Sequence, residues 1–186
     1  MAQEMSTDDI INFFSGKKEY RSLSNFWEND VIVNGRTYES GEHCFHGEKY
    51  IRIGEISSEK RKKILLEYGK TFLKPSPYTS GAIAKKMGGK KGMLLTPMEL
   101  KLWEEISVDV QSDICEMKLE YYEEVRDDLK KSGDKILIHP ALRCSVERLE
   151  RTRFWEGKGI IKDGKVVVLG KNKLGNIWME LRKNKL

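Results

Sequence analysis

Residues 40–49 of this 186-residue chain read SGEHCFHGEK, and the fold can be worked out from this segment. Ser40 is a favourable helix N-cap, because its hydroxyl oxygen can accept a hydrogen bond from an amide of the first turn. A helix that begins there has Glu42 in its first turn, where the helix dipole favours an ionised carboxylate. Lys49 follows two turns later on the same face, with Phe45 between them. A carboxylate and an amine on one half-apolar face are what a small hydrolytic site needs.

The same segment has a plainer interpretation, a surface helix whose charged side chains point into solvent. His43, Cys44 and His46 also resemble a metal site at first sight. Neighbouring residues diverge on a helix, however, and the only histidine elsewhere is His139. We therefore expect no metal and no cofactor.

Length and composition predict a single globular domain over residues 1–186, long enough to bury most of its extended surface. Hydrophobic residues make up 39% and charged residues 34% of the chain. No run approaches the about 18 apolar residues of a membrane helix, and the first residues do not resemble a signal peptide. The three cysteines are far apart and odd in number. We expect a reduced, cytoplasmic protein without disulfides.

Charge points to a phosphorylated substrate. A formal net charge of +5 suits a nucleotide, but it is weak support for tight binding to duplex DNA or RNA. Residues 89–92 (GKKG) could cradle a phosphate with backbone amides and two ammonium groups, or form a flexible loop. Residues 170–175 (GKNKLG) could hold an anion at the start of the last helix, or form an ordinary strand-to-helix turn.

Turn residues and periodicity predict the other elements. Asn34-Gly35 between β-prone runs predicts a hairpin over residues 30–38 that leads into the Ser40 helix. Thr96 and Pro97 open the longest helix, which reaches about residue 131 and bends near Ser107. Further strands are expected at residues 10–14, 135–138 and 165–169, a further strand edge at 144–147, and further helices at 57–66, 81–87 and 176–182.

Short motifs extend over nearly the whole chain, from Ile10 to Arg182. In order, they are residues 11–15 (INFFS), 23–26 (LSNF), 33–38 (VNGRTY), 42–49 (EHCFHGEK), Met87-Gly88, Trp103, Val146-Glu147, Trp155 with Gly157, 170–175 (GKNKLG) and 179–182 (MELR). Each is weak alone, but the ordered set is specific. With these motifs the chain resembles the NADAR (YbiA-like) family.

The resemblance implies a compact α+β domain, mainly helical with small antiparallel sheets. It also implies an enzyme, an N-glycosidase that cuts a bond between a ribose carbon and a nitrogen. Two substrate classes are associated with such proteins: ribosylamino-pyrimidine phosphates that arise early in riboflavin synthesis, and ADP-ribose attached to guanine. The partner would be a small nucleotide or an ADP-ribosylated nucleic acid, with no membrane and no obligate protein partner.

The family matches assign catalytic roles to Glu42, Lys49, Trp103 and Trp155, which we expect to line one pocket. Glu42 would stabilise positive charge on the ribose or activate a water. Lys49 would be a cation that holds a hydroxyl or phosphate, or a neutral amine that forms a Schiff base. The two tryptophans would stack on the base or frame the sugar. The expected substrate-binding residues are Ser24, Asn25, Phe26, His43, Gly88, Thr152, Gly170, Asn172 and Gly175.

The chain departs from the family pattern in three places. His46 stands where glutamine is common, Gly47-Glu48 stands where a small residue or glutamine is common, and Thr152 stands where an aspartate is usual. Threonine can hydrogen-bond a sugar hydroxyl but cannot act as a carboxylate, and Glu150 is too displaced to be a good substitute. The missing aspartate favours a competing interpretation, a non-catalytic module that binds ADP-ribose or NAD. The pair of Glu42 and Lys49 favours an enzyme, and a general nucleic-acid binder has only the high pI in its favour.

Overall fold

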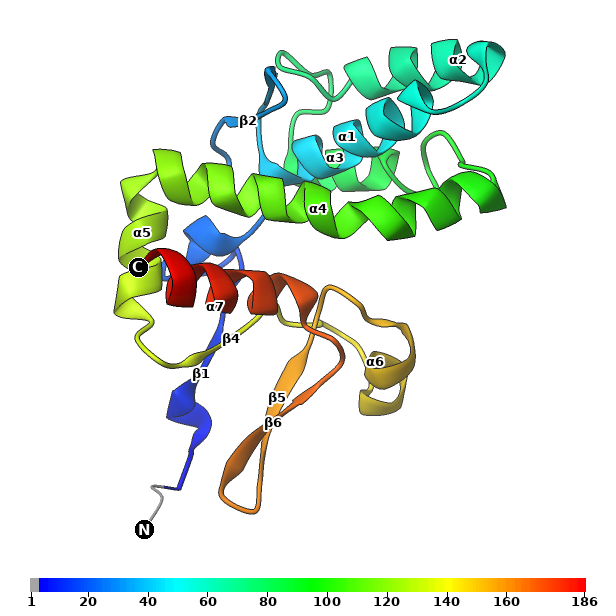
Figure 1. Ribbon diagram of the computed structural model, residues 1–186. Helices are drawn as coiled ribbons and strands as arrows, with labels where there is room; N and C mark the ends of the chain where they lie inside the picture. The colour runs from blue at the N-terminus through cyan, green and yellow to red at the C-terminus, as the bar shows by residue number, and fades with distance from the viewer. Residues whose placement is uncertain (1–3) are drawn as a thin grey trace. The chain divides into compact units, whose positions relative to one another are not determined.

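A computed structural model describes residues 4–186, with the exception of the side chain of Thr152 (Figure 1). The chain divides into two compact units. We call residues 25–121 the central unit, and the segments up to Ser24 and from Tyr122 onward the terminal unit. The prediction of one domain over residues 1–186 is not tested by this division and stays a prediction. In the described part of the chain, no helix combines the length and apolar character needed to cross a membrane.

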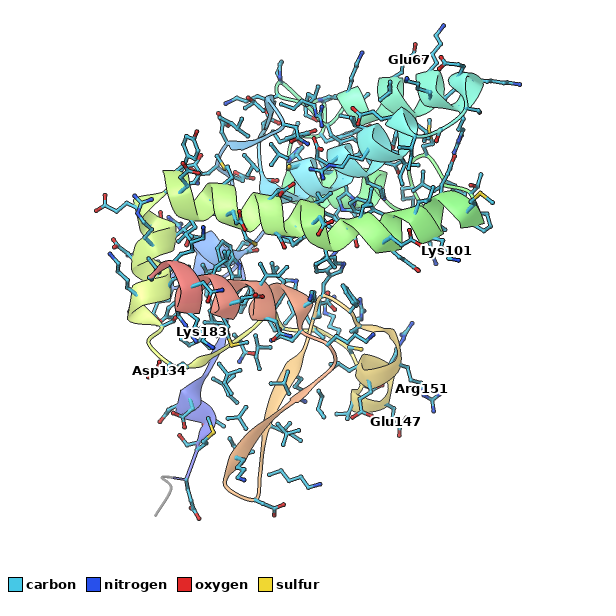
Figure 2. The ribbon with its side chains drawn as sticks, viewed as in Figure 1. Glu67, Lys101, Asp134, Glu147, Arg151 and Lys183 are labelled. Atoms are coloured by element: carbon cyan, nitrogen blue, oxygen red, sulfur yellow. The ribbon has the colours of Figure 1, made fainter. Side chains whose placement is uncertain are left out.

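The central unit is a group of helices with one β-hairpin. Its elements are β2 (Val31–Val33), β3 (Arg36–Tyr38), α1 (Gly41–Glu55), α2 (Glu59–Lys70), α3 (Gly81–Met87) and α4 (Pro97–Tyr121). Helix α1 contacts α2, α3, α4 and both strands, and it can be followed between α2 and α4 in Figure 1. Figure 2 shows the side chains of Glu67 on α2 and Lys101 on α4 pointing away from α1. α1 is therefore the enclosed helix of this unit.

Local sequence explains how α1 begins. Asn34 and Gly35 both have positive φ (50° and 72°), the conformation of a tight hairpin turn, and β2 and β3 pair antiparallel on either side. Ser40 follows in an extended conformation, and its Oγ accepts a hydrogen bond from the His43 amide at 3.3 Å. The predicted hairpin and the predicted N-cap are both confirmed.

Burial of α1 was not visible in its sequence. Twelve of its 15 residues are buried, including Glu42 (8% exposed), Glu48 (0%) and Lys49 (8%). The interpretation of this segment as a surface helix with solvated charges is therefore wrong. A buried charge is tolerated only when it is paired or hydrogen-bonded. Each of these side chains should therefore have a partner in the fold or a role in chemistry.

Glu48 is held by a set of donors from β3 and α1. Its Oε1 accepts from Arg36 Nε at 2.7 Å and from the Tyr38 hydroxyl at 2.6 Å. Its Oε2 accepts from Arg36 Nη2 at 2.9 Å and Arg52 Nε at 2.8 Å, and Arg52 Nη2 continues to Asp113 on α4 at 2.9 Å. Burial alone would raise the pKa of Glu48, but these hydrogen bonds outweigh burial and lower it.

The terminal unit contains the remaining elements. They are η1 (Thr7–Asp9), β1 (Ile10–Asn12), η2 (Arg21–Leu23), α5 (Glu123–Lys131), β4 (Ile136–Ile138), α6 (Val146–Thr152), β5 (Lys158–Lys162), β6 (Lys165–Leu169) and α7 (Lys173–Lys185). β1 pairs with β4 in parallel, whereas β5 and β6 form an antiparallel hairpin. α7 packs on β4 and α5. Trp178 of α7 is fully buried, and its indole N–H donates to the Leu23 carbonyl at 2.9 Å.

The predicted class, a mainly helical α+β protein with small sheets, is confirmed, but three details differ. The pair β1–β4 is parallel rather than antiparallel, because most of the chain lies between these strands and no tight turn constrains them. The predicted strand edge at residues 144–147 is wrong. Ser145 is instead the N-cap of α6, with Glu147 in the first helical turn. The long helix continues without a break through Ser107 and is divided at Tyr122, whose extended backbone separates α4 from α5.

Replacing Glu48 with leucine (Glu48→Leu) should lower the free energy of unfolding by about 3–5 kcal/mol, because two guanidinium groups and a buried hydroxyl lose their acceptor. Urea denaturation at neutral pH measures the loss. The same substitution at Glu55, an exposed residue of the same helix, is the matched control and should change stability by no more than about 0.5 kcal/mol.

The difference between wild type and Glu48→Leu should also depend on pH. The pKa of Glu48 is lowered in the folded state, so its stabilisation is complete above the unfolded pKa of about 4.3 and is lost as pH falls through the folded value. Equal stability of the two proteins at pH 7 would contradict this account of Glu48.

Candidate active site

Helix α1 carries a second set of ionisable groups on a face away from Glu48. Glu42 lies in the first turn, and His46 follows four residues later, which brings the two side chains together. His46 Nε2 lies 3.1 Å from Glu42 Oε2, and both residues are buried. Among the described residues, Oε1 of Glu42 has no hydrogen-bond partner. The carboxylate therefore has one oxygen held by the protein and one oxygen available for chemistry.

Lys49 completes this face. Its Nζ donates to the backbone carbonyl of Gly88, which follows α3, and lies 4.9 Å from the centre of the Tyr50 ring. Burial lowers the pKa of Lys49 to about 8, although the negative charge of Glu42 acts in the opposite direction. A substantial fraction of this amine is consequently neutral at mildly alkaline pH. A neutral amine is the form that can attack a carbon atom.

Gly88 is what lets α3 approach α1 closely. A Cβ atom built at this position would overlap Nδ1 and Cγ of the His46 ring. The same residue supplies the carbonyl that binds Lys49. Gly88 thus sets the positions of two site residues, and its predicted contact with substrate stays a prediction.

Aromatic rings border the site. Trp103 of α4 is half-buried and packs against Phe45, with ring centres 4.9 Å apart and planes at 66°. Phe45 in turn packs edge-on against His46, with centres 5.5 Å apart. Phe26 lies near the start of α1, where Lys85 Nζ is 5.4 Å from its ring centre. Trp103 is thus joined through Phe45 to His46 on the Glu42 face, and its predicted catalytic role stays a prediction.

Asn25 and His43 hold the first turn of α1. The side-chain amide of Asn25 exchanges two hydrogen bonds with Gln111 of α4, at 2.6 and 3.1 Å, and the backbone carbonyl of Asn25 accepts from the Glu42 amide at 2.9 Å. His43 Nε2 donates to the Tyr78 carbonyl at 2.7 Å, which leaves Nδ1 to accept from the Ser40 hydroxyl at 2.8 Å. Both side chains are engaged in the fold, and their contact with substrate stays a prediction.

The other predicted site residues belong to the terminal unit. Trp155 is half-buried and packs edge-on against Phe154, with ring centres 5.0 Å apart. Ser24 is fully buried, and the side chain of Thr152 lies outside what the structure describes. The two units are described separately, so a pocket shared by Trp155 and Glu42 stays a prediction.

The turn at residues 170–175 is engaged in backbone contacts. The amides of residues 171–174 donate to carbonyls of residues 153–156, so these four amides are not open to a phosphate. The buried side chain of Asn172 donates to the Leu137 carbonyl at 2.9 Å and accepts from the His139 amide at 3.0 Å. The interpretation as a strand-to-helix turn fits these contacts, while substrate contacts of Gly170, Asn172 and Gly175 stay a prediction.

Two contributors to the site were missed by sequence reasoning. His46 is one, and the four-residue spacing from Glu42 could have identified it. Gln111 is the other, and no local signal marks its pairing with Asn25. As for metals, the described residues contain no group of three His, Cys, Asp or Glu side chains placed to hold an ion. Burial raises the pKa of the Cys44 thiol well above its ordinary value, which makes it a poor ligand or nucleophile.

Comparisons with known proteins agree with the motifs. A family model, the NADAR domain, matches residues 12–184. The N-glycosidases YbiA of Escherichia coli (strain K12) and Shigella flexneri are each 28% identical to this chain over 180 residues, which is 97% of this chain and 91% of theirs. The NMR structure of E. coli YbiA matches with a TM-score of 0.59 at 26% identity, over 98% of this chain and 86% of that one. The predicted resemblance is confirmed.

Replacing Gly88 with alanine (Gly88→Ala) should lower the free energy of unfolding by about 1–3 kcal/mol, because the added methyl group displaces the His46 ring from a packed site. Gly89→Ala is the matched control. Its Cβ would lie 3.4 Å from the Lys85 carbonyl, an ordinary contact, and the position is exposed. Thermal and urea unfolding of both variants measure the difference, and equal losses would refute the proposed role of Gly88.

Proposed function

The chain belongs to the NADAR domain family, and from this membership we propose that it hydrolyses the bond between C1 of a ribose and a nitrogen atom. It is an enzyme of the hydrolase class that acts on N-glycosyl bonds, like its YbiA relatives. The observation that carries this proposal is the buried Glu42 carboxylate. One of its oxygens has no hydrogen-bond partner among the described residues, and it lies two helical turns from Lys49, an amine of lowered pKa.

The chemistry follows from the charge that develops in the reaction. As the C1–N bond breaks, its electron pair goes to nitrogen and positive charge builds on the ribose ring. The free oxygen of Glu42 can stabilise that charge, or accept a proton from a water whose oxygen bonds to C1. The departing nitrogen gains a proton, so the products are a free ribose hydroxyl and the base or amine. Because Glu42 is shielded from bulk water, its charge acts over a short distance with little screening.

Lys49 has two possible parts in this reaction, and we favour a direct one. As a cation it would hold a ribose hydroxyl or a phosphate. As a neutral amine it would bond to C1, expel the nitrogen, and open the ring to a Schiff base while the ring oxygen gains a proton. Water would then hydrolyse the imine and release the amine. Its lowered pKa supports the second route, because the neutral form is accessible near physiological pH.

A phosphate-bearing substrate is supported by the distribution of charge. Residues 68–98 contain six lysines and no aspartate or glutamate. This segment includes Gly88, which contacts both His46 and Lys49, and Lys85, which lies beside Phe26. Lys74 pairs with Asp30, whereas Lys70, Lys85, Lys86, Lys90 and Lys91 are exposed and form no ion pair among the described residues. ADP-ribosylated guanine and ribosylamino-pyrimidine phosphates both carry the phosphates that such a surface attracts.

The second candidate function is a module that binds ADP-ribose or NAD without cleaving it. Threonine at position 152, where the family usually has aspartate, is the observation in its favour. If that aspartate only oriented a ribose hydroxyl, threonine can retain part of the interaction through a neutral hydrogen bond. The enzyme remains the better account, because a binding module has no need of a buried carboxylate beside a low-pKa lysine.

Replacing the carboxylate by an amide (Glu42→Gln) should lower turnover by about a hundredfold or more while leaving the unfolding temperature nearly unchanged. The assay is release of the base from guanine-ADP-ribosylated DNA and, separately, from a ribosylamino-pyrimidine phosphate. Glu55→Gln, in the exposed last turn of α1, is the matched control and should keep wild-type turnover. A wild-type protein that binds ADP-ribose but cleaves neither substrate would instead establish the binding module.

Borohydride trapping distinguishes the two parts proposed for Lys49. If the Schiff base forms, reduction during turnover should leave a stable ribosyl adduct that mass spectrometry assigns to Lys49. The yield should rise as pH increases through about 8, because the neutral amine is the attacking form. Lys49→Ala should lose the adduct, and Lys63→Ala, at an exposed position of α2 outside residues 68–98, should retain it. Full activity with no adduct at any pH would assign Lys49 the cationic part.

A further inference from the structure

His46 is the ionisable residue of this face that the mechanism above leaves without a part. Its ring lies between the Glu42 carboxylate and the backbone of Gly88. We propose that His46 is a positioning residue for Glu42: a neutral ring with its proton on Nε2, which it donates to Oε2 so that Oε1 faces the reacting ribose. The proposal rests on the function proposed above, because it assumes that Glu42 is the reacting carboxylate.

The hydrogen bond defines where the proton resides. An ionised carboxylate can only accept, so a ring nitrogen 3.1 Å from Glu42 Oε2 must donate. A neutral imidazole has one donor nitrogen and one acceptor nitrogen. With the proton on Nε2, Nδ1 therefore carries a lone pair.

The surroundings of Nδ1 agree with this tautomer. Nδ1 is buried without a hydrogen-bond partner among the described residues, and it faces Gly88 so closely that a Cβ there would overlap it. A second proton, on Nδ1, would have no acceptor among the described residues. An imidazolium is therefore disfavoured at this position.

The charged groups around the ring act in both directions. Glu42 on α1 favours the protonated ring, while Lys49 on α1 and Lys85 on α3 oppose it. Phe45 and Phe72 supply only apolar ring surface on the other sides. Burial is the strongest influence, and together these effects lower the pKa of His46 below its ordinary value. The ring is thus a neutral donor over the pH range in which the enzyme would work.

A fixed donor at this position has a defined consequence for the site. A carboxylate on a flexible side chain rotates, and only some of its orientations direct an oxygen toward the substrate. His46 occupies Oε2 and leaves Oε1 as the oxygen without a protein partner. Because His46 packs against Gly88 and Lys49 bonds to the carbonyl of Gly88, the directions of carboxylate and amine are set through one residue. His46 should therefore affect turnover more than substrate binding.

Two variants of His46 test the proposal through kinetics. Glutamine (His46→Gln) retains an N–H donor of similar reach, so kcat should stay within about threefold of wild type. Leucine (His46→Leu) fills the space without a donor, so kcat should fall tenfold or more while KM changes less than about twofold. Unfolding temperatures of both variants establish that they are folded. A leucine variant with wild-type kcat, or a glutamine variant as impaired as the leucine variant, would overturn the positioning role.

A second readout does not depend on activity. Nitrogen-15 NMR of the His46 ring in the wild-type protein should report the neutral Nε2–H tautomer at neutral and mildly alkaline pH, above the ordinary histidine pKa of about 6.5. In Glu42→Leu that tautomer preference should weaken, because the acceptor is gone. A ring that is protonated on Nδ1, or charged at neutral pH, overturns the proposal. If the wild-type protein cleaves neither substrate, the proposed function fails, and the NMR result alone still decides whether His46 donates to Glu42.

Discussion

The buried carboxylate of Glu48 is the interaction on which the central unit depends. It accepts hydrogen bonds from Arg36, Tyr38 and Arg52, and Arg52 extends the network to Asp113 on α4. A fully buried carboxylate without donors is too unfavourable to persist, so α1 can adopt only the rotation that satisfies Glu48. That rotation in turn sets the direction of every other side chain on the helix, including those of the candidate site.

Two glutamates of one helix therefore illustrate two uses of a buried charge. Glu48 has donors for both oxygens, which lower its pKa and leave it no capacity for chemistry. Glu42 has one oxygen held by His46 and one without a partner among the described residues. Lys49 likewise forms no ion pair among the described residues, and burial lowers its pKa to about 8. Incomplete satisfaction of buried polar groups costs stability, and it is typical of sites where a substrate supplies the missing partner.

Gly88 joins this chemistry to the lysine-rich segment of residues 68–98. Its missing side chain lets His46 approach, and its carbonyl receives Lys49. Residues 68–98 contain lysines but no aspartate or glutamate, so the segment is positively charged, and its Lys85 acts on the His46 ring beside Glu42. A phosphorylated ribosyl substrate would satisfy both features at once, since its phosphates suit the lysines and its C1 carbon suits the carboxylate.

Local sequence patterns predicted several features of the fold and of the candidate site. Hairpin turns, N-caps and helical periodicity depend on neighbouring residues, so Asn34-Gly35, the Ser40 cap and the shared face of Glu42 and Lys49 were readable directly, and ordered motifs identified the family. Long-range packing supplied the rest. The enclosure of α1, the lowered pKa of Lys49 and the Gln111 partner of Asn25 arise from residues distant in sequence. No local pattern encodes them, because burial and hydrogen-bond pairing depend on which surfaces meet after the chain has folded.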